Sequence, residues 1–145
     1  MTVRLLIAIL AAAATLAACG GNRFERPGYA FGCPIGMEKK ITDKEALIES
    51  KLEGSGQVSD IEVVDLRCSE RSGLMRVEFD VMNESRNVRR FAYRFRWLDK
   101  EGMRAWDDEA LKPVLVYGKT LHTISTVTPT PEVADFRLML LDQNN

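Results

Sequence analysis

The sequence predicts an all-β protein with an immunoglobulin-like antiparallel β-sandwich, and three observations point to this fold class. Apolar and polar residues alternate with period two in several short segments after residue 60. Polar turns separate these segments, and no long segment has the period of a helix. The chain has 145 residues, of which 46% are hydrophobic and 28% charged, so it is large enough for one domain with its own core.

The first 18 residues are typical of a secretory signal peptide. Fifteen of them are apolar, and Arg4 is the only charged residue among them. The apolar run is too short for a comfortable transmembrane helix. The segment Leu16–Cys19 resembles the bacterial lipobox, in which the peptide is cut before a cysteine that receives a diacylglycerol and an N-linked acyl chain. An ordinary signal peptide with an incidental cysteine is the alternative.

We therefore expect residues 1–18 to be cleaved and Cys19 to be lipidated. Two or more acyl chains would anchor the protein stably, because each buried methylene contributes about 0.8 kcal/mol. Gly20 follows the cysteine, whereas an aspartate at that position retains enterobacterial lipoproteins in the inner membrane. The motif thus predicts an outer-membrane lipoprotein whose domain faces the periplasm.

Residues 19–40 are expected to form an irregular lipid-anchored tether, and residues 41–145 the β-sandwich domain. The tether is rich in glycine and has no sustained periodicity. It contains Cys33, and Cys68 is the remaining cysteine besides Cys19. Because the periplasm is oxidising, we expect a disulfide between Cys33 and Cys68 that stabilises the fold by about 3–4 kcal/mol. Two independent thiols are the alternative.

A short helix is predicted near residues 43–53. Thr42 and Glu45 have the spacing of a capping box, Ile41 is placed for a hydrophobic staple, and Gly54 ends the helical pattern. Strands follow from residue 61 onward. They are expected at Ile61–Leu66, Leu74–Val81, Phe91–Trp97, Leu115–Tyr117, Thr120–Val127 and Phe136–Leu140, with a polar turn region at Arg67–Gly73.

The strand at Phe91–Trp97 is the strongest strand prediction, and its four aromatic side chains are expected in the core. We expect it to form a hairpin with the strand at Leu74–Val81, with Phe79 opposite Phe95. This register places Val77 opposite Trp97 and Val81 opposite Tyr93 on the inner face, and Glu78 opposite Arg96 and Asp80 opposite Arg94 on the outer face.

Several of these segments resemble one protein family. Leu74–Val77, Asn83–Ser85 and Tyr93–Gly102 are similar to the core of the YcfL-like lipoproteins of Gram-negative bacteria, and Asp135–Leu138 is similar to their last strand. The resemblance covers about residues 61–141. It implies an immunoglobulin-like β-sandwich in a small outer-membrane lipoprotein. It implies no catalytic or ligand-binding residues, because the family has no established activity.

The resemblance also bears on partners. In enterobacteria the family's gene lies near that of a lipoprotein activator of a peptidoglycan synthase, which hints at a partner in the cell-wall synthesis machinery. The present chain departs from the family by its longer N-terminal segment with Cys33, by Cys68 and by the predicted helix.

No catalytic, cofactor or metal site is predicted. His122 is the only histidine and has no serine or cysteine nucleophile at a recognisable spacing. The acidic segment Asp107–Glu109 lacks the alternating ligands of a calcium loop, so a solvated loop or a first helical turn explains it better. Residues 19–145 have a formal net charge of −2, which argues against nucleic acid as the principal partner.

The densest basic cluster has two interpretations. It consists of Arg86, Arg89, Arg90, Arg94 and Arg96. The cluster could bind the anionic groups of envelope ligands, or it could be a solvated sheet face neutralised by Glu78, Asp80 and Glu84. The second interpretation is favoured, and it accounts least well for the hairpin tip. Trp106 lies outside the core pattern. The residues considered for an interaction patch are therefore Arg86, Arg89, Arg90 and Trp106.

The predicted function is a non-catalytic, lipid-anchored interaction module of the outer membrane. It would contact another envelope protein, with a free sheet edge as one means of pairing. The alternative is binding of peptidoglycan or lipopolysaccharide through the Arg86–Arg96 hairpin. No cofactor is expected apart from the covalent lipid on Cys19.

Overall fold

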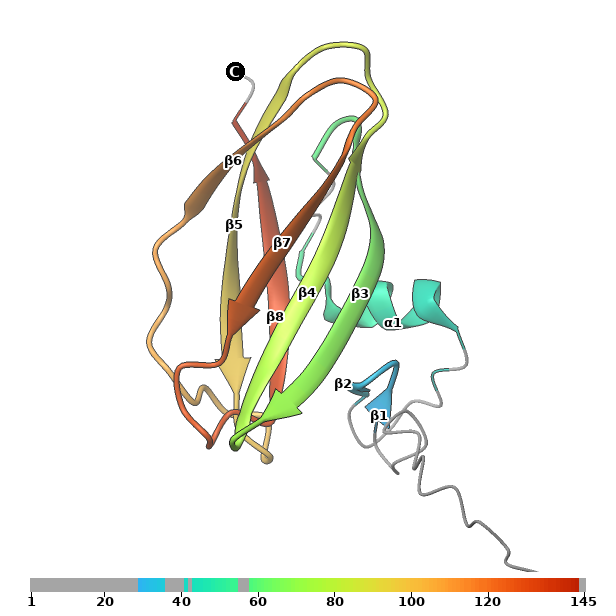
Figure 1. Cartoon of the computed structure of the whole chain (residues 1–145). Helices are drawn as coiled ribbons and strands as arrows, with labels where there is room; N and C mark the ends of the chain where they lie inside the picture. The colour runs from blue at the N-terminus through green and yellow to red at the C-terminus, as the bar shows by residue number, and fades with distance from the viewer. Residues whose placement is uncertain (1–28, 36–40, 42, 55–57, 144–145) are drawn as a thin grey trace, which may run out of the picture.

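The computed structural model describes residues 29–35, 41, 43–54 and 58–143. The predicted signal peptide, the predicted lipidation site at Cys19 and most of the predicted tether lie outside these residues. Within them, two three-stranded sheets pack face to face, with a short helix beside them (Figure 1). The predicted antiparallel β-sandwich with one short helix is confirmed.

The first sheet has the strand order β3–β4–β7, and the second has the order β6–β5–β8. All neighbouring strands in both sheets are antiparallel. The elements are β1 (Tyr29–Ala30), β2 (Cys33–Pro34), α1 (Lys44–Lys51), β3 (Ile61–Arg71), β4 (Leu74–Asn83), β5 (Arg89–Leu98), β6 (Lys112–Val116), β7 (Leu121–Val127) and β8 (Asp135–Asp142).

The core lies between the two sheets and is rich in aromatic rings. Phe79 of β4 contacts two rings of β5, with centroid distances of 5.5 Å to Tyr93 and 6.0 Å to Phe95. Phe95 in turn stacks on Trp97 at 4.7 Å. The β5 aromatics are all buried, as the alternation predicted. Aromatic pairs of this kind add to the stabilisation from burial alone, so these rings hold the sheets together.

The predicted hairpin between β4 and β5 is wrong, because the two strands belong to different sheets. Phe79 does meet Phe95, but it does so across the core. The predicted pairs of Glu78 with Arg96 and of Asp80 with Arg94 therefore do not form. Alternation identifies the buried face of a strand and leaves its hydrogen-bonding neighbour undetermined, which is why the pairing failed.

Two element boundaries also differ from the prediction. Helix α1 begins after Asp43, whose side chain accepts a hydrogen bond from the Ala46 N–H at 2.8 Å. It ends at Lys51, before the predicted stop, because Leu52 has an extended backbone and pairs with β8. Strand β3 continues to Arg71 through most of the predicted turn region, since its later residues pair with β4.

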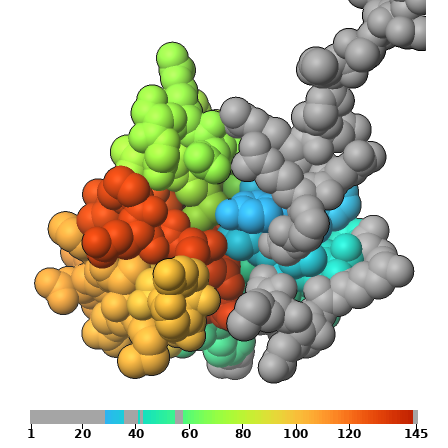
Figure 2. All heavy atoms as spheres, turned by 90° about the horizontal axis from the view of Figure 1, so that it is seen from below, coloured from blue at the N-terminus to red at the C-terminus, as the bar shows by residue number. Residues whose placement is uncertain are grey.

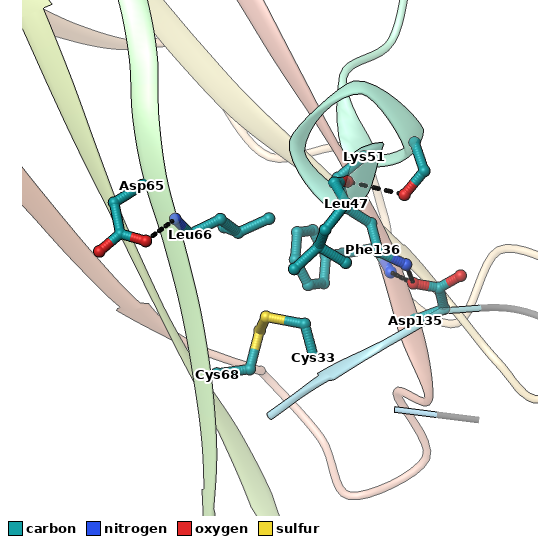
Figure 3. The surroundings of a disulfide bond; sticks show 9 residues. Cys33, Leu47, Lys51, Asp65, Leu66, Cys68, Asp135 and Phe136 are labelled. Atoms are coloured by element: carbon teal, nitrogen blue, oxygen red, sulfur yellow. Dashed lines mark hydrogen bonds and ion pairs between the residues drawn. A yellow bond between two sulfur atoms is a disulfide. The ribbon is translucent and has the colours of Figure 1, made fainter. Parts of the chain in front are cut away.

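Part of the predicted irregular tether is ordered against the domain. β1 and β2 form a minimal hairpin, and Cys33 of β2 is bonded to Cys68 of β3 (Figure 3). The predicted disulfide is thus present in the structure. Leu47 of α1 and Phe136 of β8 lie next to it, and both Cys33 and Leu47 are fully buried. The hydrophobic core therefore begins before residue 41, the predicted start of the domain.

Candidate functional site

Each sheet ends in two edge strands, and the four edges differ in what covers them. β3 and β7 are the edges of the first sheet, and β6 and β8 are the edges of the second. An exposed edge offers unpaired N–H and C=O groups to any extended chain, so soluble proteins usually protect it. Comparing the four edges indicates where this domain can bind another polypeptide.

The β3 edge is covered and irregular. Helix α1 and strand β2 both pack against β3. The N–H of Cys68 donates to the carbonyl of Phe31 at 3.4 Å, beside the disulfide. A register shift between Val63 and Asp65 bends the strand, and such bulges are a common protection of sheet edges.

The two edges of the second sheet are also protected. On β8, Leu52 forms a parallel bridge with Leu138, and the Glu53 N–H donates to the Leu138 carbonyl at 2.9 Å. β6 is only five residues long and contains Lys112 and Pro113. Proline has no N–H to offer, and an edge lysine resists the approach of a second strand.

The β7 edge lacks these protections. Its seven residues, Leu121–Val127, include no proline and no Asp, Glu, Lys or Arg. β7 pairs with β4 along its whole length, and no segment within the described part of the chain pairs with its other side. Four of the seven residues are β-branched, which favours pairing with a further strand. β7 is therefore the candidate functional site.

The hydrogen bonds at both ends of β7 show which main-chain groups face outward. The Thr128 N–H donates to the Met75 carbonyl at 2.8 Å, and the Thr120 carbonyl accepts from the Asn83 N–H at 3.1 Å. Alternate residues of an antiparallel strand bond to the same neighbour, so the even-numbered residues face β4. The outward groups belong to Leu121, Thr123, Ser125 and Val127.

The open edge has an apolar residue at each end. The exposed fraction is 56% for Leu121 and 50% for Val127. Tyr117 lies in the turn before β7 and is 66% exposed. Apolar cross-strand pairs stabilise a sheet, so an incoming strand would gain most from apolar residues near its two ends.

The start of β7 is held rigidly by the connection before it. Asn83 is fully buried, and its side-chain amide donates to the carbonyls of Asn87 at 2.8 Å and Val116 at 2.9 Å. A side chain at Gly118 would collide with the Arg86 carbonyl, since its Cβ would lie only 2.3 Å from that oxygen. A preorganised edge loses little entropy when a partner binds.

Side chains on the outer face tie β7 to the rest of its sheet. Arg67 of β3 donates to both oxygens of Asp80 at 2.8 and 3.1 Å, and the Thr123 hydroxyl donates to Asp80 at 2.7 Å. The hydrogen bonds from Arg67 hold the pKa of the Asp80 carboxyl below its usual range. β7 is thus anchored on one side by ladder and side-chain bonds while its other side stays open.

The arginines of the predicted basic cluster do not form one free basic surface. Arg89 is paired with Asp60, and Arg96 with Glu53. The acidic residues that were expected to neutralise the cluster have other partners. Glu78 pairs with Arg76, Asp80 with Arg67, and Glu84 with Lys119. Arg86 and Arg90 are exposed, and Arg94 is half-buried.

Trp106 lies at the other end of the sandwich from Arg89. The Ala105 N–H donates to the Trp97 carbonyl at 2.9 Å, which places Trp106 about 25 Å along β5 from Arg89. Figure 2 shows this end, where the β5–β6 and β7–β8 connections lie side by side. Trp106 is 48% exposed, so its position outside the core is confirmed. The predicted patch therefore divides into two distant surfaces.

His122 and the acidic segment Asp107–Glu109 are the other residues considered for catalysis or metal binding. His122 lies exposed on β7, opposite Val81. Glu109 accepts hydrogen bonds from Trp97 Nε1 at 2.9 Å and from Lys112 Nζ at 2.8 Å, so it has a structural role. In the described ranges, no group of three or more His, Cys, Asp or Glu residues is placed to hold a metal ion. None of the described helical residues forms a helix long and apolar enough to cross a membrane.

The sequence predicts a free sheet edge without indicating which strand provides it. The segment 120–127 was predicted as a strand, and its lack of charge and proline was the available signal. That signal becomes meaningful only when β7 is known to be an edge. The role of Asn83 in fixing the β6–β7 turn was missed, because its contacts come from residues distant in sequence.

Comparison with known proteins places the chain in a family. A family model described as a protein of unknown function, DUF1425, matches residues 46–142, which include the six strands of the two sheets. The chain therefore belongs to the DUF1425 family. No curated protein matches it.

Two solved structures share the fold. One is the crystal structure of a DUF1425 family member from Shewanella sp. pv-4, with a TM-score of 0.55 and 19% identity, covering 65% of this chain and 88% of that one. The other is the crystal structure of Campylobacter jejuni cj0090, with a TM-score of 0.50 and 22% identity, covering 63% of this chain and 96% of that one. At these identities the likeness concerns the fold alone.

Proposed function

We propose that this member of the DUF1425 family is a non-catalytic interaction module that binds an extended segment of another envelope protein along β7. The observation that carries the proposal is the contrast among the four sheet edges. Three are covered, bulged or blocked by proline, whereas the seven residues of β7 are uncharged and open. β-Strand addition uses such an edge, with main-chain hydrogen bonds for affinity and alternate side chains for specificity.

We further propose that the module is held at the outer membrane by a lipid on Cys19. The support is the lipobox-like segment Leu16–Cys19, together with the resemblance to the YcfL-like lipoproteins. A tethered domain meets its partners at a high effective concentration, so even a weak strand-addition contact would be occupied. This suits a partner that is also fixed in the envelope, such as a protein of the cell-wall synthesis machinery.

The partner's segment can be described from the edge itself. Its central residues would lie beside Thr123 and Ser125, whose hydroxyls already bond to Asp80 and Arg76. Its apolar residues would lie beside Leu121 and Val127. We therefore expect a segment of about seven residues in extended conformation, with apolar side chains near both ends.

Ligand binding through the arginines of the segment Arg86–Arg96 is the weaker proposal. Two of its arginines, Arg89 and Arg96, are already paired with carboxylates. Arg89 and Arg96 also lie near opposite ends of β5, so the segment does not present one basic surface. Arg86, at the exposed start of this segment, therefore serves as a comparison position for crosslinking.

In-cell photo-crosslinking tests the proposal. A photoreactive amino acid at Val127 is expected to give an adduct with one envelope protein, mapped by mass spectrometry to a continuous segment. Ser125→Pro removes an outward N–H without breaking the ladder to β4, so we expect the adduct to fall about tenfold or more while the melting temperature stays nearly unchanged. Cys19→Ser should also lower the adduct, by releasing the protein from the membrane.

A probe at Val64, which is 40% exposed on the covered side, is the matched control and should give no such adduct. The same adduct from both probes, or an adduct that survives Ser125→Pro, would contradict strand addition. An adduct of the chain only with itself would replace the proposal by pairing of two copies. An adduct from a probe at Arg86 alone would favour binding through the Arg86–Arg96 segment.

A further inference from the structure

A pocket of about 530 Å³ lies on the second sheet, at the end where β5 reaches Leu98. Its size is within the range of small-molecule sites. The polar part of its lining is Arg96, Arg104, Arg137 and Glu53, and Leu98 and Met103 supply much of the apolar part. Its location and lining are separate from the β7 edge, so a ligand in this pocket would not compete with a strand bound at β7.

The fold brings three guanidinium groups to this pocket from three elements. Arg96 of β5 and Arg137 of β8 are register partners, and both lie on the outer face because their neighbours Trp97 and Phe136 are buried in the core. Arg104 comes from the β5–β6 connection, which forms a bridge with Leu98. Like charges directly opposite each other destabilise a sheet, so this arrangement calls for an explanation.

The ion pair between Arg96 and Glu53 is incomplete. Arg96 contacts Glu53 Oε1 through Nη1. Arg96 Nε and Glu53 Oε2 are both buried and have no hydrogen-bond partner. Buried polar atoms are almost always satisfied, and exceptions often mark functional sites. A bidentate acceptor that displaced Glu53 could satisfy both Nε and Nη of this guanidinium.

The other two arginines are also only partly neutralised. Arg137 contacts Asp135 at 3.1 Å, but the same carboxylate accepts from Lys51 Nζ at 2.6 Å. Arg104 lies 3.7 Å from Asp108, and both side chains are largely exposed. Four cations therefore share these three carboxylates.

The loop that carries Arg104 is held in place by its own hydrogen bonds. The Asp99 side chain accepts from the N–H of Glu101 at 3.0 Å and of Met103 at 2.8 Å. The Gly102 N–H donates to the Asp99 carbonyl at 3.1 Å. A preorganised loop retains its arginine near the pocket without a ligand, which lowers the entropic cost of binding one.

We propose that this pocket binds a phosphate monoester group between Arg96, Arg104 and Arg137. Three planar guanidinium donors suit the three terminal oxygens of such a group, and arginine recognises phosphate by paired hydrogen bonds. Leu98 and Met103 would contact the organic part of the ligand. In the absence of ligand, Glu53 occupies Arg96 and acts as a competing internal anion.

Titration of the ¹⁵N-labelled full-length protein with inorganic phosphate tests the proposal. The protein is kept in a zwitterionic detergent at constant ionic strength, and the Arg96 Nε–Hε resonance is followed by NMR. We expect a saturable shift of this resonance. Arg137→Gln should weaken binding about tenfold by removing one charged donor. Glu53→Gln should strengthen binding about threefold or more, since it removes the competing charge.

The gain from Glu53→Gln is decisive, because a variant that merely misfolds cannot bind more tightly. Arg94→Gln is the matched control, since Arg94 lies on the same face of β5 two residues from Arg96 but does not line the pocket. Equal weakening by Arg94→Gln and Arg137→Gln would show non-specific charge attraction and overturn the proposal. A resonance that phosphate does not shift would overturn it as well.

The source of the phosphate is distinguished by a second titration. Dihexanoyl phosphatidic acid, below its micelle concentration, presents the same group with an apolar tail. If it binds at least about tenfold more tightly than inorganic phosphate, the proposed site takes a lipid headgroup. If the two bind equally, the site takes a soluble phosphate compound.

Discussion

On one side of the sandwich, where β3 and β8 are the edge strands, a helix, a minimal hairpin and a disulfide cover the sheets. On the other side, where β6 and β7 end theirs, the described residues add no element beyond the short turn that joins the two strands (Figure 1). The covered side buries Leu47 and Cys33 completely, whereas the open side exposes Leu121 and Val127.

The N-terminal elements therefore protect the side formed by β3 and β8, whereas β7 on the other side stays available for pairing. A small β-sandwich needs protection against edge-to-edge association. Here three of the four edges are protected and β7 is not, so a general need for stability does not explain the open β7 edge. Three changes should separate the contributions of the two sides to the free energy of unfolding.

Removing the disulfide should cause the largest loss on the covered side. Cys33 and Cys68 are 35 residues apart in sequence. We expect the double variant Cys33→Ser with Cys68→Ser to lower the free energy of unfolding by about 4 kcal/mol, measured by urea denaturation. Reduction of the unmodified protein should give the same loss. A loss below about 1 kcal/mol would mean that packing around Leu47 alone holds the N-terminal segment.

Asp135→Asn should have the next largest effect. Lys51 of α1 is almost fully buried, and its Nζ lies 2.6 Å from Asp135 Oδ1 (Figure 3). Burial lowers the pKa of Lys51, while the charge of Asp135 opposes this shift. Removing that charge leaves a buried ammonium without its partner, so we expect a loss of about 3 kcal/mol in calorimetry or denaturation.

The matched control for this variant is an exposed ion pair. Glu84 pairs with Lys119 at 3.2 Å, with both side chains about half exposed. Glu84→Gln should cost less than about 0.5 kcal/mol, because exposed ion pairs contribute little. Equal losses from Asp135→Asn and Glu84→Gln would contradict the expected difference between the buried and the exposed ion pair.

Lowering the pH should have the smallest of the three effects on stability. It acts on a network of ion pairs and hydrogen bonds that extends from α1 to β7. Lys44 of α1 contacts Asp65, Arg67 contacts both Asp65 and Asp80, and Asp80 accepts from Thr123 of β7. Hydrogen bonds from Arg67 lower the pKa of Asp80. A lowered pKa in the folded state means that the stabilisation is complete above the unfolded value of about 4 and is lost as the pH falls through the folded value.

Denaturation from pH 7 to pH 2 checks this expectation. Asp80→Asn should lower stability by about 2 kcal/mol at pH 7 and should flatten the acid limb of the profile. Stability that is independent of pH below 4 in the unmodified protein would contradict it. Since β7 is one end of the network, crosslinking from Val127 should also weaken in this variant.

Much of the fold followed from local pattern. The alternation in Phe91–Trp97 and Leu74–Val81 correctly identified the buried faces of β5 and β4, since a strand can bury only one set of alternate side chains in a sandwich. The pair of cysteines correctly predicted the disulfide. Strand neighbours were not predictable in the same way, because any apolar face fits against several others.

The candidate site was less accessible to sequence reasoning. The arginines drew attention because they are close together in the chain, yet Arg89 and Arg96 are engaged by residues from distant segments. The pocket formed by Arg96, Arg104 and Arg137 brings Arg137 together with two arginines from a much earlier part of the chain, so no motif could indicate it. The composition of β7 was visible from the start, but its significance depends on its place at the edge.

The sequence by itself determined the fold class, the inward faces of the strands and the cysteine pair, because each depends on periodicity or on the chemistry of a residue type. Tertiary structure alone decided which strands are edges, which carboxylate each arginine meets and where α1 ends. The physical reason is that hydrogen bonds to strand neighbours and contacts between distant side chains are chosen by how the sheets pack. Leu52 shows this directly, since it leaves the helix because the edge of β8 offers a better partner.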